Sequence, residues 1–311
     1  MKKVCIFSFS GTGMTNYVVD LIKAELEKRG FGVDVKKIEY TNVKDVDLEA
    51  YDSMGIAYPV HSFNAPKIVV DFARTLPMAF IQNSFVISTA GDYSVINASS
   101  SRHLIKTMNK KNHDVFYDKQ FVMPSNFMMR NKFEVSKLLE MAQVEASKVA
   151  DAIRFTSYHK SKDNVFTRII SVVGRIEWLG AKVMGKFFYS NEKCTGCKTC
   201  VKYCPNRNIK IEEKQLKFKW KCGLCMRCLY SCPEQAIEIR HPFKFIKLKE
   251  WYENPEFTLV KKKPEVLEQK AEIVSDNSAD NTSDNSADIT SDSTLGNSSD
   301  NTSDNSDEKL E

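Results

Sequence analysis

The sequence lacks a long uninterrupted hydrophobic run, and this absence limits the kind of protein it can encode. The chain begins MKKVCIFSFS, with neither a long apolar signal core nor a small-residue cleavage site. Its most apolar segment, residues 165–188, contains five charged residues and does not predict a transmembrane helix. We therefore expect a cytoplasmic protein without a transmembrane segment.

Two common nucleotide-binding motifs are also missing. The segment Ser10–Asn16 reads SGTGMTN; Asn16 stands where a dinucleotide motif has its third glycine, and no Gly-Lys-Ser/Thr follows as in a P-loop. The sequence shows neither a separate nicotinamide-binding domain nor a nucleic-acid recognition motif. Direct oxidation of NAD(P)H and binding of nucleic acid are therefore disfavoured.

Residues 275–311 have almost no apolar side chains. They form a degenerate S-D-N-S/T repeat, which cannot offset the entropy cost of ordering, so we expect a disordered tail. The tail has a formal charge of −9 within a chain of +5, so residues 1–274 have a charge of +14. This basic body is either simply a solvated surface or a binding surface for an acidic redox partner. Many of its lysines lie in one segment, at Lys193, Lys198, Lys202, Lys210, Lys214, Lys217, Lys219 and Lys221.

Cysteines are abundant, and eight of the nine belong to two copies of C-x-x-C-x-x-C-x-x-x-C-P. Four disulfides are disfavoured because small disulfide domains occur in secreted chains. Zinc gives no reason for a third cysteine at the same short spacing, nor for a proline after the fourth. The spacing is that of two [4Fe–4S] clusters with crossed ligation, because the cysteine before proline leads the chain away. We assign one cluster to Cys194, Cys197, Cys200 and Cys232, and the other to Cys222, Cys225, Cys228 and Cys204.

Short apolar runs alternate with helical patterns over the first 158 residues. Strands are predicted at residues 3–9, 32–38, 53–58, 84–89 and 115–123, with helices between them and a long closing helix from Glu134 to about Tyr158. This alternation predicts an α/β doubly wound parallel sheet. Ligands of such sheets bind beyond the carboxyl ends of the strands. Three loops leave those ends, at residues 8–16, 58–66 and 89–94.

The first of these loops has the composition of a phosphate site. Four hydroxyl side chains and two glycines precede a helix N-terminus, where backbone N–H groups and the helix dipole favour an anion. Without a lysine, the loop suits a monophosphate, although an ordinary strand–helix turn is the alternative. The residues are Ser8, Ser10, Thr12 and Thr15 with Gly11 and Gly13.

Together these features resemble a flavodoxin-like domain fused to a bacterial two-[4Fe–4S] ferredoxin domain, as found in anaerobic, clostridial-type bacteria. The resemblance covers residues 1–243. It implies that FMN contacts the loop Ser8, Ser10, Gly11, Thr12, Gly13, Met14, Thr15 and Asn16. It also implies ring contacts from Pro59, Val60, His61, Ser62, Phe63 and Asn64 and from Thr89, Ala90, Gly91, Asp92 and Tyr93. Met14 replaces a polar residue, and the usual ring-stacking tryptophan is absent, leaving His61, Phe63 or Tyr93 for that role.

The expected organisation has five parts. A flavodoxin-like FMN-binding domain (1–159) is followed by a connecting amphipathic helix (160–189), a small α+β two-cluster ferredoxin domain (190–243), a C-terminal extension (244–274) and the disordered acidic tail (275–311). The connecting helix has an apolar stripe at Val165, Ile169, Val172, Ile176, Leu179 and Val183, flanked by Arg168, Arg175 and Lys182. We expect this stripe to pack against a domain. The alternative is a basic interfacial helix on an anionic membrane.

Three functions fit these features. The first is an electron-transfer flavo-iron-sulfur protein that relays electrons between two [4Fe–4S] clusters and FMN for a redox protein partner. The second is an FMN-dependent reductase of a small molecule, with His61 or Tyr93 as the acid. The third is an iron–sulfur redox sensor whose flavodoxin fold binds no flavin. The sequence leaves the oligomeric state open.

Overall fold

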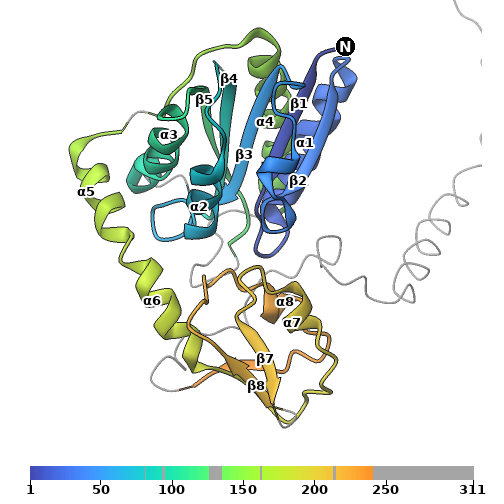
Figure 1. The fold of residues 1–311 in the computed structure, drawn as a ribbon, viewed down its shortest axis with the longest axis vertical. Coiled ribbons are helices and arrows are strands. Elements are labelled where there is room, and N and C mark those ends of the chain that lie inside the picture. The colour runs from blue at the N-terminus through green and yellow to red at the C-terminus, as the bar shows by residue number, and fades with distance from the viewer. Residues whose placement is uncertain (81, 93–94, 126–134, 162, 213–214, 241–311) are drawn as a thin grey trace, which may run out of the picture. The chain divides into compact units, whose positions relative to one another are not determined.

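The computed structural model describes residues 1–80, 82–92, 95–125, 135–161, 163–212 and 215–240, all of which belong to one compact unit. The predicted C-terminal extension and disordered tail lie outside the described residues, as does Tyr93. The described residues form an N-terminal part around a parallel sheet and a C-terminal part that contains the cysteine repeats (Figure 1).

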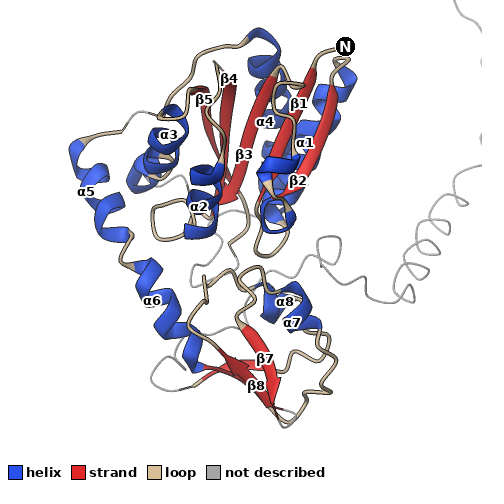
Figure 2. Cartoon of the chain, viewed as in Figure 1, coloured by secondary structure: helices blue, strands red, loops and turns tan. Residues whose placement is uncertain are grey.

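The N-terminal part is built on a five-stranded parallel sheet (Figure 2). Its strands lie in the order β2-β1-β3-β4-β5, which is the flavodoxin-like order. The predicted doubly wound α/β fold is therefore confirmed. In chain order the strands are β1 (Lys3–Ser8), β2 (Gly32–Lys37), β3 (Ser53–Pro59), β4 (Gln82–Ala90) and β5 (His113–Val122).

Helices cover both faces of this sheet (Figure 1). On one face, α1 (Met14–Lys28) packs against α4 (Val135–Phe155) through buried aliphatic side chains such as Ile22 and Val149. The other face is covered by α2 (Lys67–Thr75) and α3 (Arg102–Asn109). Strands β1, β3 and β4 are buried on both sides, which explains why their sequences read as continuous apolar runs.

The C-terminal part is a small α+β domain. Strand β6 (Phe188–Ser190) pairs antiparallel with β9 (Ile237–Ile239), and β7 (Ile209–Glu212) pairs antiparallel with β8 (Gln215–Phe218). Two short helices, α7 (Thr199–Tyr203) and α8 (Arg227–Tyr230), each contain the third cysteine of one repeat. A separate apolar core holds this part together, and all the cysteines of the two repeats except Cys197 and Cys225 belong to it or pack against it.

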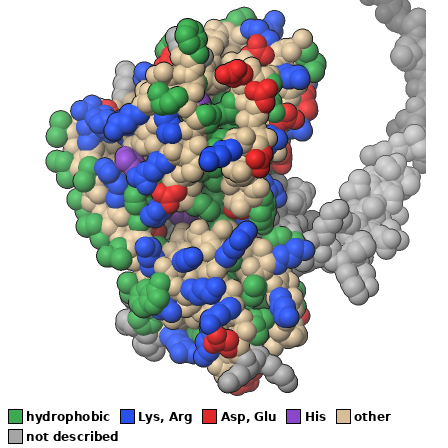
Figure 3. Space-filling view, viewed as in Figure 1, with side chains coloured by type: hydrophobic (Ala, Val, Ile, Leu, Met, Phe, Trp, Pro, Cys, Tyr) green, Lys and Arg blue, Asp and Glu red, His purple; other side chains and the backbone are tan. Residues whose placement is uncertain are grey.

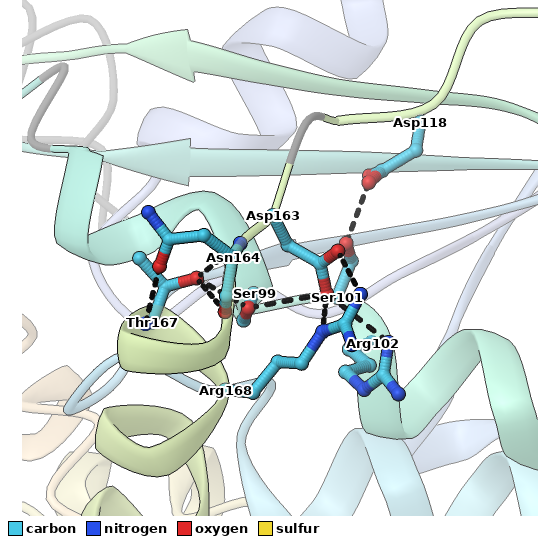
Figure 4. Close-up of polar contacts among 8 residues, drawn as sticks. All are labelled: Ser99, Ser101, Arg102, Asp118, Asp163, Asn164, Thr167 and Arg168. Atoms are coloured by element: carbon cyan, nitrogen blue, oxygen red, sulfur yellow. Dashed lines mark hydrogen bonds and ion pairs between the residues drawn. The ribbon is translucent and has the colours of Figure 1, made fainter.

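The predicted connecting helix is two helices, α5 (Val165–Gly174) and α6 (Glu177–Met184). Helix α5 begins at a capping box (Figure 4): the Thr167 amide donates to Asn164 Oδ1 (2.9 Å), and the Asn164 amide donates to Thr167 Oγ1 (3.1 Å). Asp163 binds Arg102 of α3 (3.1 Å) and Arg168 of α5 (2.9 Å). These contacts fix the start of α5 beside α3.

The apolar stripe of α5 and α6 is exposed, so the prediction that it packs against a domain is wrong. Helix α5 instead buries its polar residues Thr167 and Ser171, which are 1% and 3% exposed. The Thr167 hydroxyl lies 2.8 Å from that of Ser99. Polar contacts thus determine which face of α5 is turned inward. None of the helices in the described ranges combines the length and hydropathy that a membrane-spanning helix requires.

Candidate cofactor sites

The loop between β1 and α1 forms a tight turn ahead of an uncapped helix N-terminus. The Gly13 amide donates to Ser10 Oγ (3.0 Å), and Gly13 adopts φ 105°, a left-handed conformation that favours glycine. No side chain caps the first turn of α1. The N–H groups of that turn are therefore available to an anion, as the predicted phosphate loop requires.

The hydroxyl side chains of this loop also connect neighbouring strands. Thr15 Oγ1 lies 2.8 Å from Thr89 Oγ1 at the end of β4, and Ser8 Oγ donates to Asn16 Oδ1 (2.9 Å). Met14 is buried in the core between α1 and the sheet, which explains why this position of the loop needs no polar residue. Four predicted FMN-contact residues therefore form two directly bonded pairs.

The loop after β3 is a two-residue turn in a strained conformation. His61 and Asn64 exchange two backbone hydrogen bonds of 2.9 Å, and the residues between them, Ser62 and Phe63, have φ values of 41° and 64°. Non-glycine residues with such values are uncommon and occur often at ligand sites. Burial lowers the pKa of His61 to about 4, so its imidazole is neutral at pH 7.

A contact with a residue 107 positions further along the sequence holds this turn in place. Asn64 is buried; its Oδ1 accepts from the Ser171 hydroxyl (2.8 Å), and its Nδ2 donates to the Ser171 carbonyl (2.7 Å). Sequence reasoning missed this role of α5. The sequence did contain one signal of this role, because Ser171 is a polar residue on the side of the helix opposite the apolar stripe.

The third predicted loop lies beside the second. The Val60 amide donates to the Thr89 carbonyl (2.8 Å), so the chains leaving β3 and β4 run together. A side chain at Gly91 would place its Cβ 2.8 Å from Ser125 Cβ, so only glycine fits there. The structure therefore brings the described parts of all three predicted loops to one edge of the sheet.

The two cysteine repeats have the same backbone conformation. Left-handed residues occur at Gly196 and Lys198 in the first repeat and at Leu224 and Met226, the equivalent positions, in the second. The fourth cysteine of each repeat accepts an N–H···S bond from the residue four positions later, Asn208 to Cys204 at 3.2 Å and Ala236 to Cys232 at 3.3 Å. All nine cysteines are free in this structure.

The cysteines surround two small cavities, and each cavity combines both repeats. The four cysteines around each cavity are three from one repeat and the fourth from the other repeat, which is the combination that crossed ligation requires. Ligation of a cluster by these cysteines stays a prediction. In the described residues, no three Cys, His, Asp or Glu side chains converge closely enough to share a single metal ion. One set is Cys194, Cys197, Cys200 and Cys232; the other is Cys204, Cys222, Cys225 and Cys228.

Arg227 connects the second cysteine set to the predicted phosphate loop. It lies between Cys225 and Cys228, and its Nη2 donates to the Ser10 carbonyl (2.6 Å). Its Nη1 donates to Glu39 Oε1 (2.6 Å), and the two side chains are only 4% and 1% exposed. The backbone fit is equally close, because a Cβ added at Gly11 would lie 2.2 Å from the Cys225 carbonyl oxygen.

Sequence reasoning did not identify Arg227. The signal was a difference between the repeats: the residue before the third cysteine is Thr199 in the first repeat and Arg227 in the second. Its partner Glu39 is 188 residues away, so only the fold reveals the pair.

A larger cavity of about 460 Å³ lies next to this contact. His61 lines it together with Cys222 and Cys225 of the second cysteine set and Trp178 of α6. Burial raises the pKa of the Glu177 carboxyl on its wall to about 7. The cavity therefore joins the loop after β3 to the second cysteine set.

Comparison with known proteins identifies the C-terminal part. A family model described as a 4Fe-4S dicluster domain matches residues 186–233, which include all eight clustered cysteines. This match confirms that the cysteine repeats form an iron–sulfur domain. No curated protein sequence matches the chain.

Solved structures similar to this chain match about half of it. Reduced flavodoxin from Megasphaera elsdenii is 19% identical over 47% of this chain and 98% of its own, with a TM-score of 0.32. A flavodoxin from Streptococcus pneumoniae is 15% identical over 49% and 99%, with a TM-score of 0.34. Rubredoxin oxygen:oxidoreductase from Desulfovibrio gigas is 12% identical over 50% of this chain but only 37% of its own, with a TM-score of 0.37. Strand order and the family match together show a flavodoxin-like domain joined to a 4Fe-4S dicluster domain.

Proposed function

We propose that this protein is an electron carrier that relays electrons between two [4Fe–4S] clusters and FMN. FMN and iron–sulfur clusters supply reversible electron transfer when bound, and the protein supplies their positions and surroundings. The contact of Arg227 with Ser10 supports the proposal most strongly, because it joins a cluster-binding loop to a phosphate-binding loop.

The residues at the sheet edge fit FMN. The first turn of α1 and the hydroxyls of Ser10 and Thr12 would bind the phosphate as neutral donors. The turn at Ser62 and Phe63, fixed by Asn64, would lie against the flavin ring. The flavodoxin-like strand order and the loop geometry support these roles.

The two cysteine sets fit two clusters with different roles. Arg227 holds the second set against the N-terminal part, so this set would bind the cluster nearer the flavin. The first set is more open: Cys197 is exposed, and Lys193 and Lys198 beside it are exposed. Electrons would therefore be exchanged with an acidic partner protein at the first set, where exposed cations favour docking.

The proposal is tested on protein purified without oxygen. Assays should find about eight irons per chain, since each Cys₄ site holds a four-iron cube, together with one FMN per chain. Photoreduction of the clusters in Arg227→Met should then reduce the flavin more slowly than in wild type, at unchanged iron and flavin content. A protein that binds clusters but no flavin would instead support the redox-sensor alternative.

The cavity of about 460 Å³ supports a second candidate, an FMN-dependent reductase of a small molecule. It is large enough for a small ligand, and the Glu177 carboxyl on its wall, whose pKa is raised to about 7 by burial, would supply the proton in place of His61, which is neutral at pH 7. Turnover of one small oxidant, with no electron transfer to protein acceptors, would favour this candidate over the carrier.

A further inference from the structure

Helices α5 and α6 expose a continuous apolar face. Of the nineteen exposed large hydrophobic residues in the described chain, eight lie within residues 165–183. Patches of this kind mark interaction sites rather than ordinary surface. We name this the α5–α6 apolar face; it consists of Val165, Phe166, Ile169, Val172, Val173, Ile176, Leu179 and Val183, which are 42–69% exposed.

The outward orientation of this face is fixed by contacts on the opposite side of α5. Thr167 and Ser171 are buried there and bind Ser99 and Asn64. The backbone of α5 also packs closely against the turn after β3, since a Cβ added at Gly174 would lie 2.2 Å from the Ser62 carbonyl oxygen. A rotation of α5 that buried its apolar residues would break these hydrogen bonds, so the folded protein keeps the face exposed.

Cations flank the α5–α6 apolar face on the side of α3. Arg175 lies between α5 and α6, Lys182 lies on α6, and the exposed Lys106 of α3 and Lys110 just after it lie nearby. The His103 ring of α3 lies 6.2 Å from that of Trp178 in α6, so the two elements adjoin. The pKa of His103 is lowered by burial first and then by Arg175, Arg74, Lys110 and Lys106, so these four cations lie near His103. Figure 3 shows Lys and Arg side chains beside the hydrophobic edge formed by α5 and α6.

Few carboxylates offset this charge. Asp163 is shared by Arg102 and Arg168, and Asp71 binds Lys67 and Arg74. Within the described residues, Lys106, Lys110 and Lys182 form no ion pair, whereas Arg175 is only half-exposed and Glu177 of α6 adds one carboxyl whose pKa is raised to about 7 by burial.

We propose that the α5–α6 apolar face docks on an anionic membrane surface. A pair of helices with exposed aliphatic residues and flanking cations binds such a surface by inserting its apolar side chains while the cations contact lipid phosphates. A second copy of the chain would bring the same cations against each other. The acidic tail has too few apolar residues to fill the face. This inference is independent of the proposed relay and would hold for any cofactor content.

The test is cosedimentation of the cofactor-loaded full-length protein with lipid vesicles. Wild type should bind vesicles of equal parts phosphatidylcholine and phosphatidylglycerol but not vesicles of phosphatidylcholine alone, and added salt should weaken binding. Ile169→Glu should lower the partition coefficient about tenfold or more, because it removes an inserted apolar side chain and adds a repelled charge. Lys106→Gln combined with Lys110→Gln should lower it about twenty-five-fold, at roughly one factor of five per cation.

Val144→Glu on α4 is the matched control, because Val144 is 58% exposed and Ile169 is 57% exposed. It should bind like wild type. Val172→Glu repeats the test if Ile169→Glu does not fold. The proposal is overturned if wild type binds both kinds of vesicle equally weakly, or if Ile169→Glu and Val172→Glu bind like wild type. It is also overturned if wild type is a dimer that Ile169→Glu converts to a monomer, or if only a chain truncated after residue 243 binds vesicles.

Discussion

Replacement of Arg227 by Met should open the contact between the two parts of the molecule. The change removes the hydrogen bonds to Glu39 and to the Ser10 carbonyl, both 2.6 Å long, and leaves the Glu39 carboxylate buried without its ion-pair partner. Breaking a buried ion pair in this way costs about 3–5 kcal/mol. Since about 1.4 kcal/mol corresponds to a factor of ten, the population of open molecules should rise at least about a hundredfold.

Native-state amide hydrogen exchange measures this population directly. Protection of the amides in residues 9–13 and 223–228 should fall by about a hundredfold, while amides in the core of the sheet keep theirs. Arg207→Met is the control, because Arg207 lies in the same domain but is exposed. The double variant Arg227→Met, Glu39→Gln should recover most of the loss, since no buried charge is then left unpaired. Unchanged protection in Arg227→Met would refute the role of this ion pair.

Four other outcomes are expected. Cys204→Ser should leave about four irons per chain, and loss of the cluster on Cys194, Cys197 and Cys200, seen by electron paramagnetic resonance, would contradict the crossed ligation. Thr12→Ala should weaken FMN binding by about 1–3 kcal/mol in a fluorescence titration but leave riboflavin binding unchanged; equal affinity of wild type for the two flavins would disprove the phosphate loop. Burial lowers the folded-state pKa of His61 from the ordinary 6.5 to about 4, so the unfolded chain takes up the proton first as the pH falls. Melting temperatures should therefore decline below pH about 6.5 more steeply in wild type than in His61→Gln, and parallel curves would count against an imidazole that the fold keeps neutral. Deletion of residues 275–311, with their −9 charge, should raise the rate of association with an acidic partner at low salt, and stopped-flow rates equal to those of the full-length chain would show that the tail does not compete.

The sequence determined the features that depend on local pattern. Short apolar runs such as residues 53–58 predicted buried parallel strands, and β3 covers this run. The cysteine spacing predicted an iron–sulfur domain because a cluster imposes its own dimensions on a short loop. The family match at residues 186–233 confirms that prediction.

The sequence was misleading about what the apolar stripe of residues 165–183 contacts in the folded protein. Periodicity at Ile169, Val172 and Ile176 correctly predicted helix, but periodicity cannot tell which face of a helix the rest of the chain will cover. Helix α5 instead packs through Thr167 and Ser171, because Ser99 and Asn64 offer hydrogen bonds at that place. Those partners are brought there by β3, β4 and the turns that follow them.

Only the tertiary structure revealed how the two parts meet. Arg227 and Glu39 are ordinary charged residues in the sequence, and their importance comes from burial, since a charge removed from water must find a partner. The fold brings Glu39, Ser10 and the loop between Cys225 and Cys228 to one point. Local sequence thus predicted which residues bind the cofactors, whereas packing across nearly two hundred residues decided which of them lie side by side.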